Sequence, residues 1–409
     1  MPALRTDHLA DRLRAVPAVA ALLPGLAGER GVHAVGGVPR DLLLGLSPLD
    51  LDLVVEGDAG ALAERLAGRL GGRVTEHGRF GTATLLVGEH SIDLAGARSE
   101  RYPRPGALPD VAPAPLAEDL RRRDFTANAI ALALDEQGPG GMLAYPGAEG
   151  DLAARRLRVL HPASFEDDPT RLLRLARYTA RLGFTAEPAT DAIARRAIAA
   201  EALGSVSAAR VGAELRLLLA EADPAGALDA AETLGLVAAI DAEWRWDRPL
   251  AERALRLLPG EERADLLLLG ALGAGAGRKR LAARLDALEL ERADRERVLA
   301  VAGARALVPA LATAQQPSEV RAAVDGAPAE AVALAGALEP AAEPAAALWL
   351  ATLRGIGLAI GGADLLAAGV PEGPAVGRGL EAALDAALDG RAPDREGQLV
   401  AALRAARGS

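Results

Sequence analysis

Short apolar runs bounded by glycine characterise the first third of the chain. GVHAVGG at 31–37, LDLVVEG at 51–57 and HSIDLAG at 90–96 each contain a segment of strand length. DAGALAERLAGRL at 58–70 instead places its apolar residues at helical spacing. Strands interleaved with helices predict an α+β head, built as a mixed sheet with helices.

The strand pattern ends near residue 150, and apolar residues then recur at helical spacing to the end of the printed sequence. Proline and glycine divide this part into a series of helices. Between Arg98 and Asp119 the chain has five prolines, a density that excludes both a helix interior and a central strand. The pattern therefore predicts an α+β head, a proline-rich loop and an all-α remainder.

Composition narrows the possible chemistry. Half of the 409 residues are hydrophobic and only 2% are aromatic, so the cores must be built mainly from Leu, Val and Ala. The absence of cysteine excludes disulfides, thiolate zinc sites and a cysteine nucleophile. The apolar run 266–277 has the length of a buried core helix, and prolines interrupt the run 16–28. We therefore expect a soluble cytoplasmic protein with no membrane partner.

The formal net charge of −10 argues against a nucleic-acid partner at first sight. The acidity is regional, because residues 1–216 hold 26 basic and 28 acidic side chains. Residues 151–216 hold 11 arginines against 8 acids. The total charge therefore predicts weak, salt-sensitive nucleic-acid affinity rather than none.

The segment VHAVGGVPRDLLLG at 32–45 reads as a strand, a Gly36-Gly37 turn and a helix. Glycine lets the backbone approach a ligand closely, and the free N–H groups of a helix start can bind a phosphate. Arg40 adds a positive charge at the same place. A plain strand–turn–helix connection is the structural alternative.

Asp50 and Asp52 lie two residues apart on an expected strand, so both carboxylates would share one face. Adjacent carboxylates repel unless a cation lies between them, and oxygen ligands suit Mg²⁺. Asp93, on the second strand of an expected hairpin at 82–95, could supply a third carboxylate. The alternatives are a solvated strand face and an ordinary edge-strand residue.

The segment DLRRRDFTANAIAL at 119–132 concentrates charge in an apolar chain. Arg123 could contact a triphosphate, and Asp124 with Asn128 could bond a ribose hydroxyl. The alternative is a salt-bridged helix start capped by Asp124 or Thr126.

Four arginines at 171, 174, 177 and 181 cover about 120° of an expected helix that Asp168 would cap and Pro169 would begin. Cations this close together repel, so an anion should compensate them. We expect that anion to be Asp167 and Asp168, a polyphosphate or RNA. A solvated charged face is the alternative.

Together these segments resemble the class II tRNA nucleotidyltransferase (CCA-adding or A-adding) and bacterial poly(A) polymerase family of the DNA polymerase β superfamily. GGVPRDLLLG with DLD is similar to the family's catalytic motif, RRDFTANAIA to its ribose-contacting motif and DDPTRLLRLARYTARLGF to its base-selecting motif. SAARVGAEL at 207–215 resembles a further helical motif. The resemblance implies a catalytic nucleotidyltransferase head at 1–135, a helical neck at 136–220 that binds the base and RNA, and a helical body and tail at 221–409 that bind tRNA.

The resemblance also implies roles for individual residues. Asp50 and Asp52 would hold two Mg²⁺ ions, and Asp168 with Arg171 would read the base. The remaining implied contacts are to the nucleotide's phosphates and ribose from Gly37, Arg40, Arg123 and Asp124, with Arg174 and Arg177 supporting the base-reading pair.

The implied reaction adds CCA, or its terminal A, to the acceptor end of tRNA from CTP and ATP without a nucleic-acid template. The tRNA 3′-hydroxyl attacks the α-phosphate and pyrophosphate leaves. C and A present an exocyclic amine beside a ring-nitrogen acceptor, which a carboxylate and a guanidinium can match. G and U present the opposite polarity and would be rejected.

Other activities share these motifs. An A-adding specialist of a split CC/A system and a poly(A) polymerase are alternatives, whereas CC-only addition is disfavoured because the loop at 98–119 is retained. A small-molecule nucleotidyltransferase would not need about 200 further helical residues. A catalytically inactive RNA-binding scaffold would have no reason to keep two repelling carboxylates. The sequence makes no prediction of the oligomeric state.

Overall fold

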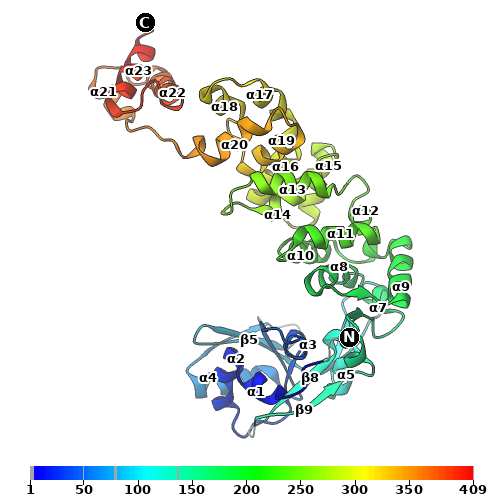
Figure 1. Ribbon diagram of the computed structural model, residues 1–409. Helices are drawn as coiled ribbons and strands as arrows, with labels where there is room; N and C mark the ends of the chain where they lie inside the picture. Colours follow the sequence, from blue (N-terminus) through cyan, green and yellow to red (C-terminus); the bar gives the residue numbers. More distant parts are fainter. Residues whose placement is uncertain (1–3, 49, 78–80, 136–137, 409) are drawn as a thin grey trace. The chain divides into compact units, whose positions relative to one another are not determined.

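The computed structural model describes residues 4–48, 50–77, 81–135 and 138–408. It contains two compact units, one made of Met1–Glu214 with Glu221–Ala239 and the other of Leu215–Ala220 with Ile240–Ser409 (Figure 1). We call them the first and second units and describe each by itself.

A seven-stranded sheet forms the base of the first unit, in the order β3-β4-β5-β2-β1-β8-β9. The β2–β5 pair is parallel and the other neighbouring strands are antiparallel, so the sheet is mixed. Its strands are β1 (Val32–Val35), β2 (Leu51–Val55), β3 (Arg73–His77), β4 (Thr82–Val87), β5 (His90–Gly96), β8 (Ile130–Asp135) and β9 (Gly138–Ala144). The predicted α+β head is confirmed.

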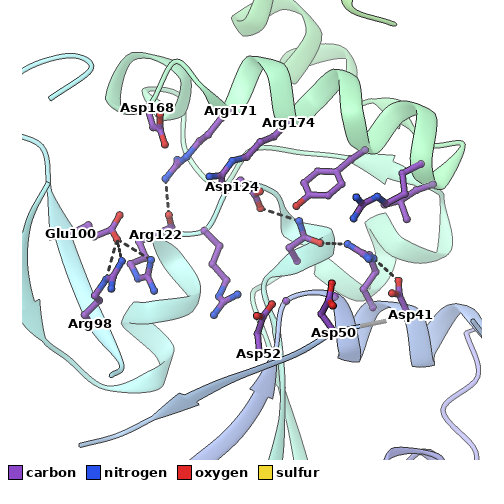
Figure 2. Close-up of a pocket in the computed structure, with 18 of the residues that line it drawn as sticks. Asp41, Asp50, Asp52, Arg98, Glu100, Arg122, Asp124, Asp168, Arg171 and Arg174 are labelled. Carbon is purple, nitrogen blue, oxygen red and sulfur yellow. Dashed lines mark hydrogen bonds and ion pairs between the residues drawn. The ribbon is translucent and has the colours of Figure 1, made fainter. Parts of the chain in front are cut away.

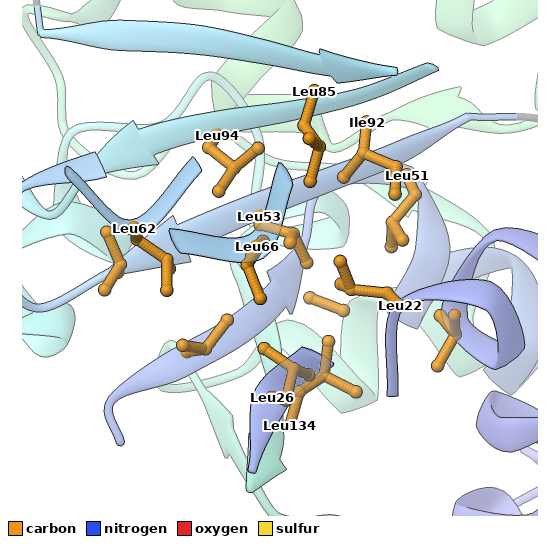
Figure 3. Close-up of a cluster of buried hydrophobic side chains, with 14 of the residues drawn as sticks. Leu22, Leu26, Leu51, Leu53, Leu62, Leu66, Leu85, Ile92, Leu94 and Leu134 are labelled. Carbon is orange, nitrogen blue, oxygen red and sulfur yellow. The ribbon is translucent and has the colours of Figure 1, made fainter. Parts of the chain in front are cut away.

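One face of this sheet carries the main core of the head. Helix α4 (Ala59–Leu70) turns Leu62 and Leu66 toward strand residues such as Leu53 and Leu94, as Figure 3 shows. The short helices α1 (Leu9–Arg14) and α2 (Pro17–Leu22) and the turn η1 (Leu23–Leu26) belong to the same cluster. Asp58 caps the start of α4 and Gly71, at φ 68°, ends it, so the predicted helix over 58–70 forms.

The proline-rich segment is more ordered than the predicted loop. It forms a two-stranded antiparallel sheet from β6 (Arg98–Arg101) and β7 (Asp110–Pro113). All four residues of β7 are exposed, and prolines are tolerated there because no further strand pairs with it. We call residues 98–115 the β6–β7 arm.

Helices complete the first unit. They are α3 (Gly37–Leu44), α5 (Leu116–Arg121), η2 (Thr126–Asn128), α6 (Ala148–Ala153), α7 (Ser164–Asp167), α8 (Arg171–Leu182), α9 (Pro188–Ala199), η3 (Ala202–Ser205), most of α10 (Ala208–Leu219), α11 (Pro224–Leu234) and most of α12 (Leu236–Ile240), with a short parallel pair β10 (Arg156–Leu157) and β11 (Thr185–Ala186).

The predicted start of the arginine-rich helix is wrong by two residues. Helix α8 begins at Arg171 with Thr170 as its N-cap, not at Pro169 after Asp168. The Asp168 carboxylate instead accepts hydrogen bonds from the Thr170 N–H at 3.1 Å and the Thr170 hydroxyl at 2.6 Å. Asp168 therefore shapes the turn that leads into α8.

The second unit is helical throughout its described part. Helix α14 contains residues 266–272, the first part of the predicted apolar run 266–277, and its leucines are all at most 3% exposed, as expected for a core helix. Its helices are α13 (Arg248–Leu257), α14 (Ala264–Leu272), α15 (Arg278–Ala287), α16 (Arg292–Ala302), η4 (Ala304–Leu307), α17 (Val308–Thr313), α18 (Pro317–Ala323), α19 (Ala329–Leu338), α20 (Glu343–Ala351), η5 (Leu353–Gly355), α21 (Gly362–Ala367), α22 (Pro374–Leu388) and α23 (Arg395–Arg407).

Within the described ranges, no helix combines the length and the apolar character that crossing a bilayer requires.

Candidate active site

A pocket of about 820 Å³ opens in the first unit between the sheet, the β6–β7 arm and helices α8 and α10 (Figure 2). Eleven of the thirteen residues predicted for the site line it. They are Gly36, Gly37, Arg40, Asp50, Asp52, Arg123, Asp124, Asn128, Asp168, Arg171 and Arg174. Asp93 and Arg177 are the two predicted residues outside its lining.

The Gly36-Gly37 turn brings the backbone close to a carboxylate. Gly36 has φ +68°, and a Cβ there would lie 3.2 Å from Oδ2 of Asp52. Both the left-handed backbone and the close approach therefore favour glycine. Helix α3 begins at Gly37, and this first helical residue lines the pocket, as phosphate binding at the helix start requires.

Two of the three predicted carboxylates lie on neighbouring strands of the sheet, and the third lies just before one of these strands. Asp52 is the second residue of β2, and the parallel register places it directly opposite Asp93 on β5. Asp50 lies in the bend before β2 rather than on the strand, which corrects the predicted shared strand face. Asp93 accepts a hydrogen bond from the Thr84 hydroxyl at 2.7 Å and lines a second pocket that also includes Asp52.

The environment of Asp52 disfavours its charged form. Loss of water around the carboxylate is the first cause that raises the pKa of Asp52, and the charge of Asp93 is the second. Arg123 acts in the opposite direction. In the described part of the chain, no group of three or more His, Asp or Glu side chains has metal-binding geometry. Asp50 and Asp52 nevertheless supply oxygen donors of the kind that Mg²⁺ prefers, and a cation would relieve their repulsion.

Hydrogen bonds connect Arg40, which is predicted to bind phosphates, to Asn128 and Asp124, which are predicted to bind the ribose. Arg40 is 5% exposed and donates to Asp41 at 2.7 Å and to the Asn128 side chain at 2.8 Å. The Asn128 amide in turn donates to Asp124 at 3.1 Å (Figure 2). Asn128 therefore connects Arg40 to Asp124 in this structure.

Two arginines of the RRRD segment are held by a buried acid that the sequence analysis missed. Asp119 is fully buried and accepts from Arg122 at 2.6 Å and from Arg123 at 3.1 Å. Glu100 of the arm also accepts from Arg122, at 2.9 Å. The signal available in the sequence was the spacing, because Asp119 precedes Arg122 by three residues and Arg123 by four.

The predicted base-reading pair lies at one end of the pocket. Asp168 accepts from Arg210 of α10 at 2.8 Å, in addition to its bonds with Thr170. Arg171 is 3% exposed and donates to the Ser164 hydroxyl and to the Arg122 carbonyl, both at 2.7 Å (Figure 2). Arg210 and Ser164 were not predicted, because both contacts depend on how separate helices pack.

The arginine stripe of α8 is compensated by two buried glutamates. Arg174 and Arg177 both donate to Glu214 at 2.8 Å, while Arg177 and Arg181 donate to Glu221 at 3.0 and 2.7 Å. Among the described residues, the acids paired with Arg174, Arg177 and Arg181 include Glu214 and Glu221 but not the expected Asp167 or Asp168, which corrects that part of the expectation. A polyphosphate or RNA partner stays a prediction. Arg174 also forms an ion pair with Asp124, with 3.7 Å between Nη1 of the arginine and Oδ2 of the aspartate.

Tyr178 is a lining residue that the sequence analysis did not single out. Its ring packs edge-on against Phe125 at 5.9 Å between centroids, and the Arg40 guanidinium lies 5.8 Å from the ring centre. Burial and then the nearby charge of Asp124 raise the pKa of the Tyr178 phenol. Its position in the helical pattern of the sequence does not differ from that of an ordinary core aromatic residue, so the sequence carried no signal that Tyr178 lines the pocket.

Comparisons with known proteins agree with this geometry. Residues 32–158 match the model of the poly A polymerase head domain. The chain is 34% identical over 428 residues to the A-adding tRNA nucleotidyltransferase of Geobacter sulfurreducens, a match that covers 98% of this chain and 48% of that protein. It is 45% identical over 192 residues to the CC-adding tRNA nucleotidyltransferase of Deinococcus radiodurans, covering 46% of this chain and 50% of that one. The chain thus spans about half the length of these curated relatives.

Solved structures give the same result over nearly the whole chain. A CCA-adding enzyme in apo form II has a TM-score of 0.83 at 28% identity, covering 98% of this chain and 99% of that one. The Thermotoga maritima CCA-adding enzyme complexed with tRNA has a TM-score of 0.77 at 28% identity, covering 98% and 99%. The first unit therefore carries a head domain of the poly(A) polymerase type. Along nearly its whole length the chain is similar to proteins of the class II tRNA nucleotidyltransferase family, in agreement with the resemblance seen in its motifs.

Proposed function

We propose that the protein is a tRNA nucleotidyltransferase that adds CCA, or its terminal A, to the 3′ end of tRNA from CTP and ATP. The observation that carries this proposal is the shared pocket. Its lining includes Asp50 and Asp52, the arginines at 40 and 123, and the Asp168–Arg171 pair. Relatives and solved neighbours named as A-adding, CC-adding and CCA-adding enzymes support it.

Asp50 and Asp52 would hold the two Mg²⁺ ions, which supply charge neutralisation and activation of the attacking hydroxyl when bound. Asp93, opposite Asp52 in the sheet register, would act as the third carboxylate. Because loss of water around the carboxylate and the charge of Asp93 raise the pKa of Asp52, a bound cation would stabilise the ionised form of this residue.

The remaining pocket residues would orient the nucleotide. The N–H groups at Gly37 and the guanidinium groups of Arg40 and Arg123 would bind its phosphates. Asp124, fixed by Asn128, would accept a hydrogen bond from the ribose. These contacts would leave the α-phosphate near the carboxylates and the base extending toward Asp168.

Base choice would follow from the polarity of the pair at 168 and 171. The Asp168 carboxylate accepts from the exocyclic amine of C or A, and the Arg171 guanidinium donates to the adjacent ring nitrogen. Arg174 would support this end of the pocket through its links to Glu214 and Asp124. Arg177, which is buried against glutamates, would support it through packing.

We further propose the division of labour that the motifs imply. Residues 1–135 would form the catalytic head, residues 136–220 the neck that binds the base and RNA, and residues 221–409 the body and tail that bind the tRNA. All predicted site residues lie between 36 and 177, within the first two of these regions.

The test offers purified protein three tRNAs, ending at the discriminator base, at C and at CC, with Mg²⁺ and each nucleotide separately. Growth of all three with CTP and ATP that stops at CCA indicates CCA addition. Growth of only the CC-ended tRNA with ATP indicates terminal A addition. Unlimited tailing would identify a poly(A) polymerase instead, and no growth on any substrate would contradict the enzymatic proposal.

A further inference from the structure

Arg210 links two parts of the pocket that the sequence places far apart. It lies in the first turn of α10, and its guanidinium is partly buried at the pocket wall. One terminal nitrogen donates to Oδ1 of Asp168 at 2.8 Å, and the other donates to the Gly106 carbonyl of the β6–β7 arm at 2.9 Å. A single side chain therefore bridges the predicted base reader and the arm.

The contacts of Asp168 are strongly unequal between its two oxygens. Oδ1 accepts three hydrogen bonds, from the N–H and hydroxyl of Thr170 and from Arg210. Among the described residues, no donor reaches Oδ2. Three donors on one oxygen fix the rotation of the carboxylate, so the second oxygen is held ready to accept from a ligand.

Arg210 contacts the β6–β7 arm at Gly106, where the arm also packs closely against residues of helices outside it. The Gly106 N–H donates to the Glu166 carbonyl at 3.0 Å, and Gly106 has φ +68°. A Cβ at Gly106 would lie 2.2 Å from Oγ of Ser205 and 2.6 Å from the Ser205 carbonyl oxygen. Because these contacts leave no room for a side chain, Gly106 holds the arm against the neck while Arg210 ties it to Asp168.

We propose that Arg210 is a positioning residue for nucleotide selection. It fixes Oδ1 of Asp168, so that Oδ2 faces the exocyclic amine of C or A, and it anchors the β6–β7 arm in register with that carboxylate. This inference rests on the proposed function, because it takes Asp168 to be the base reader. Arg210 acts through Asp168 and need not touch the nucleotide itself.

The structure gives a matched set of variants. Arg210→Ala removes one of the three donors on Oδ1 and the link to Gly106, which frees the carboxylate to rotate. Arg210→Lys keeps the charge but has no planar fork with which to span both acceptors. Arg196→Ala removes an arginine of α9 that is exposed and outside the pocket lining, and it serves as the control.

The experiment titrates the full chain with CTP, ATP, GTP and UTP separately in the presence of Mg²⁺, using calorimetry. We expect the wild type and Arg196→Ala to bind CTP and ATP more tightly than UTP and GTP. In Arg210→Ala this preference should fall at least about tenfold, because a hydrogen bond between charged groups contributes on that scale. Arg210→Lys should retain an intermediate preference. Thermal unfolding of each variant checks that it is folded.

The wild-type preference in both Arg210 variants would contradict the positioning role. Equal weakening of all four nucleotides would contradict it too, because a structural loss affects binding without affecting selection. If Arg210→Ala fails to fold, Arg210→Lys decides by the same criteria. The wild type could prefer CTP and ATP and yet extend no tRNA. That result would contradict the proposed reaction but not the positioning role, so the two failures are distinguishable.

Discussion

Several charged side chains of the pocket are oriented by hydrogen bonds to neighbouring polar groups. Arg171 is oriented by Ser164 and a backbone carbonyl, Asp168 by Thr170 and Arg210, and Arg40 by Asn128. Such pre-orientation lowers the entropy lost when a ligand binds. Asp52 is different, because its charge is opposed by Asp93 and by loss of water.

At the residue scale, we predict that Asp52→Asn is more stable than the wild type at neutral pH without Mg²⁺. A raised pKa means that the folded state binds the Asp52 proton more tightly than the unfolded state does. The contribution of Asp52 to wild-type stability therefore falls as pH rises above the ordinary value of 3.8 and through the raised pKa, and this contribution is lost above it. The variant lacks this loss.

Urea denaturation at several pH values with a chelator measures the difference. Added Mg²⁺ should stabilise the wild type more than Asp52→Asn, and the variant should lose nucleotide transfer. A variant that is less stable than the wild type across the whole neutral range would contradict the charge repulsion described for this site.

A second residue-scale prediction concerns Arg171. Arg171→Ala should lose the preference for CTP and ATP over GTP and UTP while Mg²⁺ still binds, because the guanidinium lies at the base end and Asp50 and Asp52 are unchanged. We expect a loss of about tenfold or more, on the scale of one charged hydrogen bond. Incorporation of each nucleotide and Mg²⁺ titration provide the two readouts. Retained preference would refute the base-reading role.

At the scale of elements, a network of ion pairs joins α8 to Glu214 of α10 and to Glu221, which follows that helix. The Glu214 and Glu221 side chains are 9% and 4% exposed, and Arg177 between them is 9% exposed. Buried pairs are costly to form but more costly to break, because the remaining charge loses its partner. The stripe therefore orients α8 and, through it, Arg174 and Tyr178 at the pocket.

We predict that Glu221→Ala lowers the free energy of unfolding by about 3 kcal/mol, since it leaves Arg177 and Arg181 without this carboxylate. Asp191→Ala is the control, because the Asp191–Arg195 pair is exposed and should contribute less than about 1 kcal/mol. Chemical denaturation of both variants measures the two values. Equal losses of stability in the two variants would contradict the view that burial makes the ion pairs of Glu221 stronger than the exposed Asp191–Arg195 pair.

At the scale of the whole molecule, the candidate site lies entirely within the first unit, whereas most of the acidic excess lies beyond residue 216. Nucleotide binding and tRNA binding are thus expected to depend on different parts of the chain.

A chain shortened to residues 1–239 should bind CTP and ATP within about threefold of the full chain, or ~0.7 kcal/mol, because every lining residue of the pocket is kept. Its KM for tRNA should rise if residues 221–409 contact the tRNA. Calorimetry and extension kinetics measure the two effects. An unchanged KM for tRNA would contradict the assigned role of the body and tail, and lost nucleotide binding would show that the pocket depends on the second unit.

The sequence by itself determined the features whose signal is local. Glycine pairs, alternating apolar residues and closely spaced charges fix the Gly36-Gly37 turn, the β2 strand with Asp52, and the arginine-rich helix, because backbone sterics and periodicity act over a few residues. The linked order of these motifs was enough to indicate a resemblance to the family, and eleven of the thirteen site residues predicted from it line the pocket.

The tertiary structure decided the contacts between distant segments. It alone showed that Asp93 lies opposite Asp52, that Glu214 and Glu221 compensate the arginine stripe, and that Arg210 reaches Asp168. These pairs are 37 to 44 residues apart, the Asp52–Asp93 pair included, and no periodicity in one segment specifies a partner in another. Strand register and helix packing, which depend on burial of the whole core, supply that information.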